Sequence, residues 1–303
     1  MKIREFCMFH NEFAALDIKL AEARSWVDEV HMCESSRTFQ NAPRTPVLVP
    51  GNSLLPDDPR LHCHLFDGAA RFHPAYKWGP SRYFPFFRKK KMARHNETMQ
   101  RNHVHQVFAD TADDDIIILS DSDEILDSHR ADELVDAARK HGLVSVRLHH
   151  TLFYLNLYSL NWHEVWPGSP ADYAYRVFIM TGARFRTLRE GSDRLRRRGE
   201  WGRLAGEIPL LEGFAGFHHS WLGDEQAAAA KLQSYAHSLD EHRTGLTDGD
   251  GRLSLLRLGE IIRAGQSLFE GHRLEVQDFR VMQPLRSIWE NQAKYRDLIL
   301  ESG

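Results

Sequence analysis

The sequence predicts an α/β fold in which a mixed β-sheet is flanked by helices. Short apolar runs rich in β-branched residues alternate with segments whose apolar residues recur at helical spacing. The first run, residues 3–9, precedes a helical segment and a second strand at 27–34. This order implies parallel strands joined by a right-handed crossover. A third run, residues 116–119, indicates a buried strand, and residues 128–141 form the helix after it.

The remaining elements follow from the same two periodicities. In the first helix Phe13, Leu16, Leu20 and Ala23 share one face, and Asn11 is placed to cap the first turn. The other expected strands are 61–66, 144–149 and 151–158, and the last two could form an antiparallel pair. The other expected helices are 89–108, 227–239 and 253–264. We expect residues 40–60, which contain five prolines, and residues 68–88 to be irregular connections, whereas the pattern does not assign 159–215.

Bulk composition excludes several classes of protein. The 303 residues are 42% hydrophobic and 27% charged, which fits one large α/β domain. A net charge of −3 gives no general attraction to nucleic acid or to an anionic membrane surface. No apolar run approaches the ~20 residues of a transmembrane segment, and the first residues do not resemble a signal peptide. Cys7, Cys33 and Cys63 lack paired or metal-type spacing, so we expect a cytoplasmic, reducing environment with the first two thiols buried.

Acidic residues follow the strand at 116–119 directly. The chain reads Asp121-Ser-Asp123-Glu124 there, just before the helix that Asp127 or Ser128 can cap. Open α/β sheets bind ligands at the carboxyl ends of their central strands. Desolvating several carboxylates together is costly unless a cation compensates, and hard divalent cations bridge carboxylates to phosphates. The local pattern therefore indicates a metal–diphosphate site, with a solvated loop and helix cap as the alternative.

Five segments in order carry a family resemblance. They are Phe9-His-Asn-Glu-Phe13, Glu34-Ser-Ser-Arg-Thr-Phe39, Glu97-Thr-Met-Gln-Arg101, Asp121-Ser-Asp-Glu-Ile125 and Gly216-Phe-His-His-Ser-Trp221, followed by Lys231 and Ile262-Arg-Ala-Gly265. This set resembles glycosyltransferase family 17, which includes the β-1,4-mannosyl-glycoprotein N-acetylglucosaminyltransferases. The resemblance covers residues from about 6 to about 270. The chain differs in having Phe217 where Trp is usual and in lacking the membrane anchor of the eukaryotic members, which favours a soluble bacterial enzyme.

The resemblance implies a fold and an activity. It implies a GT-A type fold, a UDP-sugar donor, a Mn²⁺ or Mg²⁺ ion and inversion at the anomeric carbon. We expect one catalytic domain over 1–270, with a nucleotide-sugar-binding half at 1–127 and an acceptor-binding half at 128–270. Residues 271–303 would be a C-terminal helical extension. UDP-GlcNAc is the favoured donor and a glycan or glycolipid the favoured acceptor, whereas the oligomeric state is not predicted.

The resemblance also assigns roles to single residues. Asp121 and Asp123 would hold the cation against the diphosphate, and Asp121 alternatively reaches the ribose. His218 would be the third ligand, with His219 as the competing assignment. Glu124 would orient a ligand.

Donor-binding residues are expected beside the metal. Four residues at the carboxyl ends of the first two strands would contact uracil and ribose: Asn11, Glu12, Glu34 and Arg37. Asn11 and Glu12 could instead stabilise the start of the first helix. Arg101 would meet a phosphate or pair with a carboxylate, and Lys231 would neutralise the diphosphate. The basic run 194–198 is expected to be a solvated face, with contact to an anionic acceptor or to the donor phosphate as the alternative.

Inversion needs a carboxylate that takes the proton of the acceptor hydroxyl. Glu164 or Asp172 is the expected base, because both lie in the aromatic-rich second half, and Asp193 or Glu207 stays open. Two other functions remain as alternatives. One is a sugar nucleotidyltransferase, which would want a Gly-rich phosphate loop with a basic residue near the first strand, and Phe9–Phe13 has none. The other is a non-catalytic glycan-binding protein.

Overall fold

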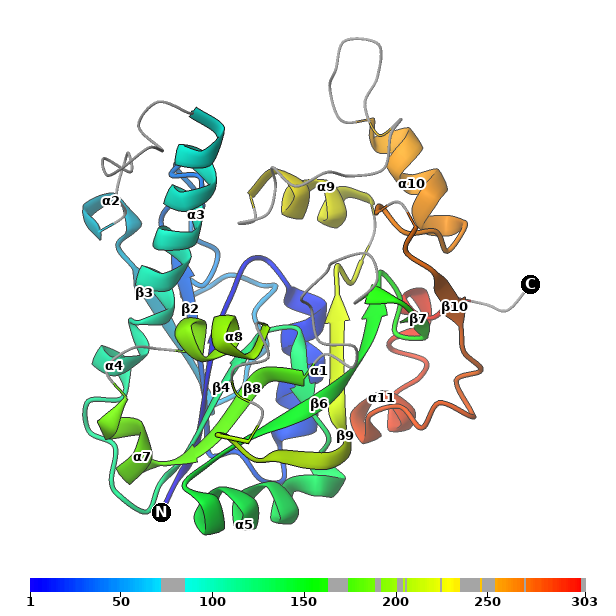
Figure 1. The fold of residues 1–303 in the computed structure, drawn as a ribbon. Coiled ribbons are helices and arrows are strands. Elements are labelled where there is room, and N and C mark those ends of the chain that lie inside the picture. Colours follow the sequence, from blue (N-terminus) through cyan, green and yellow to red (C-terminus); the bar gives the residue numbers. More distant parts are fainter. Residues whose placement is uncertain are drawn as a thin grey trace.

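The computed structural model describes residues 1–71, 85–162, 174–188, 192–200, 204, 206–223, 225–234, 246, 254–269 and 271–300. Within these ranges the chain forms a ten-stranded mixed sheet with helices packed on both faces (Figure 1). The main strand order is β10-β7-β6-β8-β4-β1-β2-β3, and β9 pairs with both β5 and β6. The predicted α/β class and the single continuous sheet are confirmed.

The first half of the sheet is parallel. Its strands are β1 (Ile3–Met8), β2 (Glu29–Ser35), β3 (Leu61–Phe66) and β4 (Ile116–Asp121). Helix α1 (Phe13–Ala23) connects β1 to β2, which confirms the predicted βαβ unit. All four carboxyl ends therefore lie at one edge of the sheet, which is the edge where open α/β sheets bind ligands.

The second half of the sheet is mixed. Strand β8 (Ala174–Thr181) runs antiparallel to both β4 and β6 (Leu143–Leu152). The antiparallel pairing is found between β6 and β7 (Leu157–Ser159), but the strand expected at 151–158 was wrong in extent, because β6 continues to Leu152 and ends where Phe153 takes a φ of 63°. The remaining strands are β5 (Glu124–Leu126), β9 (Leu210–Ser220) and β10 (Leu274–Val276).

Helices cover the two faces and the carboxyl edge. They are α2 (Gly68–Arg71), α3 (Pro85–Arg101), α4 (Val104–Val107), α5 (Ala131–His141), α7 (Gly182–Thr187), α8 (Ser192–Glu200), α9 (Glu225–Ser234), α10 (Leu255–Arg263), α11 (Arg286–Glu290) and the 3-10 turns η2 (Ser128–Arg130) and η3 (Arg296–Leu298). The single helix predicted at 89–108 was wrong, because α3 begins earlier and the chain breaks before α4. Asp127 caps η2 through a hydrogen bond from the His129 backbone N–H, as predicted.

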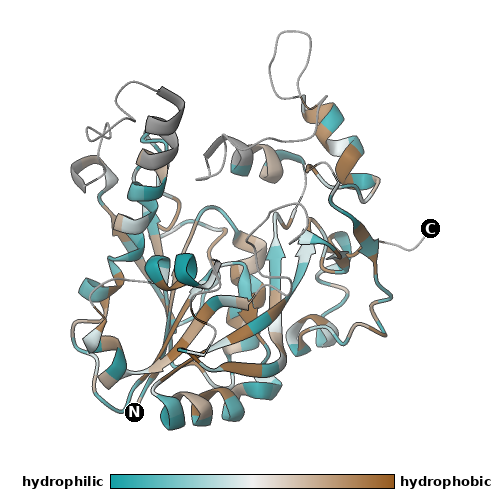
Figure 2. Ribbon diagram, in the orientation of Figure 1, coloured by the Kyte–Doolittle hydropathy of each residue, from teal (hydrophilic) through white to brown (hydrophobic). Residues whose placement is uncertain are grey.

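Apolar side chains fill two layers, one on each side of the sheet. One layer joins the sheet to α1 and α5 through residues such as Leu16, Ile118 and Leu134. The other packs Phe6 and Ile117 against α4, α7 and α8. Figure 2 shows this as hydrophobic colour along the central strands and hydrophilic colour on the outer side of α5. Cys7 and Cys33 are buried free thiols, as expected, whereas Cys63 is exposed.

The last described segment, residues 271–300, joins the sheet rather than standing apart. Strand β10 pairs with β7, and the Ser287 backbone N–H and the Tyr295 hydroxyl donate to Glu22 and Asp17 of α1, each at 2.8 Å. The proposed division at residue 270 stays a prediction. In the described part of the chain, no helix combines the length and apolar character that crossing a bilayer would take.

Candidate active site at the carboxyl edge of the sheet

The carboxyl ends of β1 and β4 lie side by side, because Met8 is in register with Asp121. The chain then turns, and the Ser122 backbone N–H donates to the Met8 carbonyl at 3.3 Å. Glu12, just beyond β1, reaches this turn: its carboxylate accepts from the Ser122 hydroxyl at 2.9 Å and from the His10 backbone N–H at 2.7 Å. Two segments more than a hundred residues apart thus form one acidic site.

Asp123 is the buried centre of this site. Its carboxylate accepts from Lys231 Nζ at 2.9 Å and lies 3.4 Å from His218 Nε2. Burial alone would raise the pKa of Asp123, but Lys231 and His218 hold it well below its ordinary value. Lys231 also lies 3.5 Å from Glu12, and its ammonium stands 5.7 Å from the ring of Trp221. The structure therefore brings the predicted residues Glu12, Asp123, His218 and Lys231 together.

A glycine positions His218. Strand β9 is wedged between β5 and β6, so that His218 pairs with Glu124 on one side and His150 on the other. Gly216 has a φ of 149°, and a Cβ there would lie 2.1 Å from the Ile125 carbonyl oxygen. Only glycine permits so close an approach. This is the physical reason for the glycine two residues before the histidine.

His219 faces the opposite side of β9, since side chains alternate along a strand. Its Nδ1 is 2.7 Å from the Thr151 hydroxyl, and burial lowers its pKa to about 3. It meets Asp123 only through its backbone, where its N–H donates to the Asp123 carbonyl at 2.9 Å. The geometry therefore favours His218 over His219 as a ligand.

Asp121 is held by two arginines. Arg101 donates to its two oxygens at 2.7 and 3.1 Å, and Arg196 donates at 2.6 Å. Burial opposes the charged form, but the two guanidinium groups hold the pKa of Asp121 well below its ordinary value. Arg196 also pairs with the fully buried Glu124. Of the two roles expected for Arg101, the structure shows the pairing with a carboxylate.

Arg196 is a site residue that sequence reasoning missed. The run 194–198 was expected to be solvated, which was wrong for Arg196, because only 5% of this residue is exposed. The spacing of residues along the helix could have identified Arg196 as inward-facing. Arg196 shares the inward face of α8 with Leu195 and with Gly199, which packs on Tyr175.

The residues fit a divalent cation in part. Asp123 Oδ1 and His218 Nε2, 3.4 Å apart, are spaced as two ligands of one ion would be. Both oxygens of Asp121 instead face guanidinium groups. Within the described ranges, three ligand atoms gather within 4.8 Å of one another at a different place, formed by Glu29, His31 and His62. Asp123 and His218 thus have the spacing of two ligands, and metal binding by Asp121, Asp123 and His218 stays a prediction.

Glu34, at the end of β2, supports the loop that follows. It is fully buried and accepts from the backbone N–H groups of Val47 and Leu48, at 2.7 Å each. Arg44 pairs with it at 2.7 Å. The carboxylate therefore fixes residues 44–48 beside the carboxyl ends of β1 and β2.

Arg44 also joins this loop to the one after β1. It donates to the Asn11 side-chain oxygen at 2.7 Å, and Asn11 takes a φ of 69°. The predicted capping by Asn11 was wrong, because Glu12 holds the cap position without a side-chain cap bond. Arg37 donates to the Asn41 carbonyl within its own loop at 2.7 Å. Arg44 carried no motif that could have revealed it.

The expected catalytic bases, Glu164 and Asp172, lie outside the described residues. The two other candidate bases are both engaged in ion pairs. Asp193 accepts from the Thr98 hydroxyl at 2.7 Å and pairs with Arg197, whereas Glu207 pairs with Arg198.

Neither a protein-family model nor a curated protein sequence matches this chain. Among solved structures, a 4-diphosphocytidyl-2C-methyl-D-erythritol synthase aligns over 76% of this chain and 97% of its own, with 10% identity and a TM-score of 0.37. The galactosyltransferase LgtC, in complex with donor and acceptor sugar analogs, aligns over 69% and 66%, with 9% identity and a TM-score of 0.29. A mannose-6-phosphate isomerase from Helicobacter pylori aligns over 61% and 73%, with 10% identity and a TM-score of 0.26. Similarities this distant carry no information on chemistry, which must come from the site itself.

Proposed function

We propose that the protein is a metal-dependent, inverting glycosyltransferase like those of family 17. It would transfer a sugar, with GlcNAc favoured, from a UDP-sugar to a glycan or glycolipid acceptor and form a β linkage. One observation carries the proposal: carboxylates and cations converge at the carboxyl edge of β1 and β4. The carboxylates are Glu12, Asp121 and Asp123, and the cations are Arg101, Arg196 and Lys231.

This arrangement matches the charges of a nucleotide diphosphate. The leaving UDP carries two negative charges that need compensation. Lys231 and Arg196 lie within the acidic site and would neutralise them. Asp123 and His218 would hold Mn²⁺ or Mg²⁺, which supplies Lewis-acid stabilisation of the leaving diphosphate. Without a ligand, Lys231 balances the buried Asp123 charge, which explains how the acidic site stays folded.

The nucleoside end would lie beside the loops after β1 and β2. Asn11, Glu12 and Arg37 are the proposed contacts to uracil and ribose. Glu34 would act there by holding the 44–48 loop, since its carboxylate is already engaged by that backbone. Glu164 or Asp172 remains the proposed base, which takes the acceptor proton in a single displacement.

Asp123→Asn tests the proposal directly. Wild-type protein at 100 times the Kd of UDP, with Mn²⁺, should be stabilised by ~2.7 kcal/mol, which thermal unfolding detects. Asp123→Asn should lose this stabilisation and the release of UDP from UDP-GlcNAc, because the amide keeps the shape but removes the charge. Asp136→Asn, an exposed change on α5, is the matched control. Normal turnover by Asp123→Asn would refute the site, and no UDP binding by the wild type would refute the function.

One observation keeps the nucleotidyltransferase alternative open. Such an enzyme needs a cation beside the loop after the first strand, and Arg44 stands there, 2.6 Å from His10 Nδ1. The two reactions differ in their products. Pyrophosphate formed from UTP and a sugar 1-phosphate would favour the alternative, whereas UDP formed from UDP-GlcNAc favours the glycosyltransferase. A glycan-binding protein would give neither product.

A further inference from the structure

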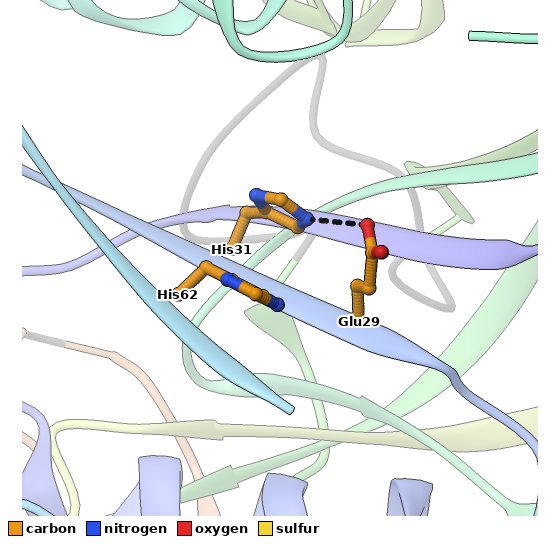
Figure 3. A group of neighbouring side chains, drawn as sticks. All are labelled: Glu29, His31 and His62. Carbon is orange, nitrogen blue, oxygen red and sulfur yellow. Dashed lines mark hydrogen bonds and ion pairs between the residues drawn. The ribbon is translucent and has the colours of Figure 1, made fainter. Parts of the chain in front are cut away.

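A second cluster of metal-ligand side chains lies at the opposite end of the parallel strands. Glu29 and His31 are two residues apart on β2 and so share one face of the sheet. His62 on β3 is in register with His31, and the two rings stack with centroids 4.7 Å apart. Figure 3 shows the three side chains converging from these adjacent strands. None of them takes part in the carboxylate site.

Their spacing suits one metal ion. A tetrahedral Zn²⁺ with ligands at 2.0–2.2 Å places neighbouring ligand atoms about 3.3 Å apart. His31 Nε2 and Glu29 Oε2 are 3.1 Å apart, and the ligand atoms of all three residues lie within 4.8 Å of one another. A small rotation of the His62 side chain would complete three protein ligands and leave a fourth position for water.

A further histidine stands behind the cluster. His64 Nε2 lies 2.9 Å from His31 Nδ1, on the side of the ring away from Glu29. Metal-binding histidines usually use their other nitrogen in this way, which fixes the tautomer and the ring orientation. Burial, more than any nearby charge, lowers the pKa of His31 to about 4, so the ring is neutral at pH 7, as a ligand must be.

Two cations share the carboxylate of Glu29. Lys2 lies 2.6 Å from Oε1, and Arg4 lies 2.7 Å from Oε2. An ion would replace the hydrogen bond between His31 and Glu29 while Lys2 stays on the other oxygen. Arg4 shares the oxygen that would face the ion, so the ion has to compete with this guanidinium group and the two cations limit the affinity of the site.

We propose that Glu29, His31 and His62 form a zinc-type site, independent of the donor site, that fastens the edge strand β3 to β2. Imidazole and carboxylate ligands select Zn²⁺ or Co²⁺ over Mg²⁺. The ion would add a further link across this edge, beside the backbone pairing and the contact of His31 with His64. On binding, His31 changes tautomer: Nε2 gives up the proton that it donates to Glu29 and turns its lone pair to the metal, and the ring proton moves to Nδ1, facing His64.

The test titrates the full chain with Zn²⁺, and with Co²⁺ for its visible absorption, in an Asp123→Asn background that disables the first site. One ion should bind, absorb as a tetrahedral Co²⁺ centre and raise the melting temperature. His62→Gln should abolish the absorption and weaken binding by more than ~100-fold. His64→Gln, which removes only the partner behind the ligand, should weaken binding ~10–100-fold.

The exposed His129→Gln, on η2, is the matched control and should bind as the background does. Equal Zn²⁺ affinity in the background and in His62→Gln would overturn the proposal. So would a Co²⁺ spectrum without tetrahedral character. His62 reaches solvent, so its replacement spares the core, and circular dichroism of each variant confirms that lost binding is not lost folding.

Discussion

Two ionic clusters lie next to each other at the ends of β1 and β4, and they differ in how fully they are satisfied. In the inner cluster, Lys19 donates to Glu5 at 2.5 Å, to the Ser120 hydroxyl at 3.1 Å and to the Glu124 carbonyl at 2.6 Å. An ammonium has three donors, and all three are used. In the outer cluster the Asp121 side chain keeps 24% of its surface exposed. We call the inner cluster closed, because every donor of its cation is used. We call the outer cluster open, because its side chains can exchange their partners for a ligand.

The difference separates structure from function. The closed cluster ties α1, β1 and the start of β5 together directly beneath Asp123, so it has no capacity left for a ligand. In the open cluster, Lys231 lies between Asp123 and Glu12, and Arg196 lies between Asp121 and Glu124. These shared cations could turn to an incoming anion when a metal ion takes over the compensation of the carboxylate that each one leaves. A ligand should therefore perturb the outer cluster alone.

The largest expected effect breaks the closed cluster. Lys19→Met leaves Glu5 buried without its cation and should lower the free energy of unfolding by ~3–5 kcal/mol in a urea titration. Adding Glu5→Leu should recover much of the loss, because it removes the unpaired charge. Lys140→Met, on the exposed side of α5, should change stability by less than about 0.5 kcal/mol. A loss below 1 kcal/mol for Lys19→Met would show that the inner cluster is not the support described here.

A smaller effect is expected from the open cluster. Arg196→Gln removes a partner from Asp121 and Glu124, so it should lower stability by about 1–3 kcal/mol and weaken UDP binding in the presence of Mn²⁺. The surface pair of Arg198 and Glu207 supplies the control. Arg198→Gln should cost less than about 1 kcal/mol and leave UDP affinity unchanged. Calorimetric titration of both variants decides. Equal UDP affinities for the two would remove Arg196 from the proposed donor site.

The difference between local features and contacts from distant elements also separates what the sequence could predict from what it could not. The strand before Asp121 and its acidic turn are local features, so the fold class, β1 to β4 and the position of the motif could be predicted. The partners of the motif could not, because they arrive from distant elements. Helical spacing places Arg196 on the inward face of α8 but does not identify Asp121 as its partner, and Arg44 lies in an irregular loop without a repeating pattern. Gly216 was part of the motif, but its steric role depends on the β5–β9 pairing.

The smallest expected effect is on the pH dependence of stability. It separates the contribution of a buried histidine from that of the ionic clusters. Burial lowers the pKa of His149 to about 4, where its ring stacks on Phe214 at 3.9 Å. The unfolded chain has a histidine pKa of about 6.5 and so binds a proton that the folded state refuses. Stability should therefore be constant above pH 6.5 and fall as the pH is lowered from 6.5 to 4. Asp121 and Asp123, with lowered pKa values, lose their contribution only at more acidic pH.

His149→Phe keeps an aromatic ring in the stack and removes the titrating group. The loss of stability between pH 6.5 and 4, followed by urea unfolding, should shrink by on the order of 1–2 kcal/mol, after allowance for the solvent-exposed edge of the ring. His272, whose pKa burial also lowers to about 4, remains in the variant, so part of the decline should persist. An unchanged slope would assign the decline to other groups. A decline that vanished completely would mean that the other buried histidines, His272 among them, titrate as they do in the unfolded chain. Below pH 4 the carboxylates lose their contribution together with His10 and His219, whose pKa values burial lowers to about 3. These histidines are common to wild type, Lys19→Met and Arg196→Gln, so comparing the acid sensitivity of the three proteins would measure how differently the closed and open clusters hold their charge.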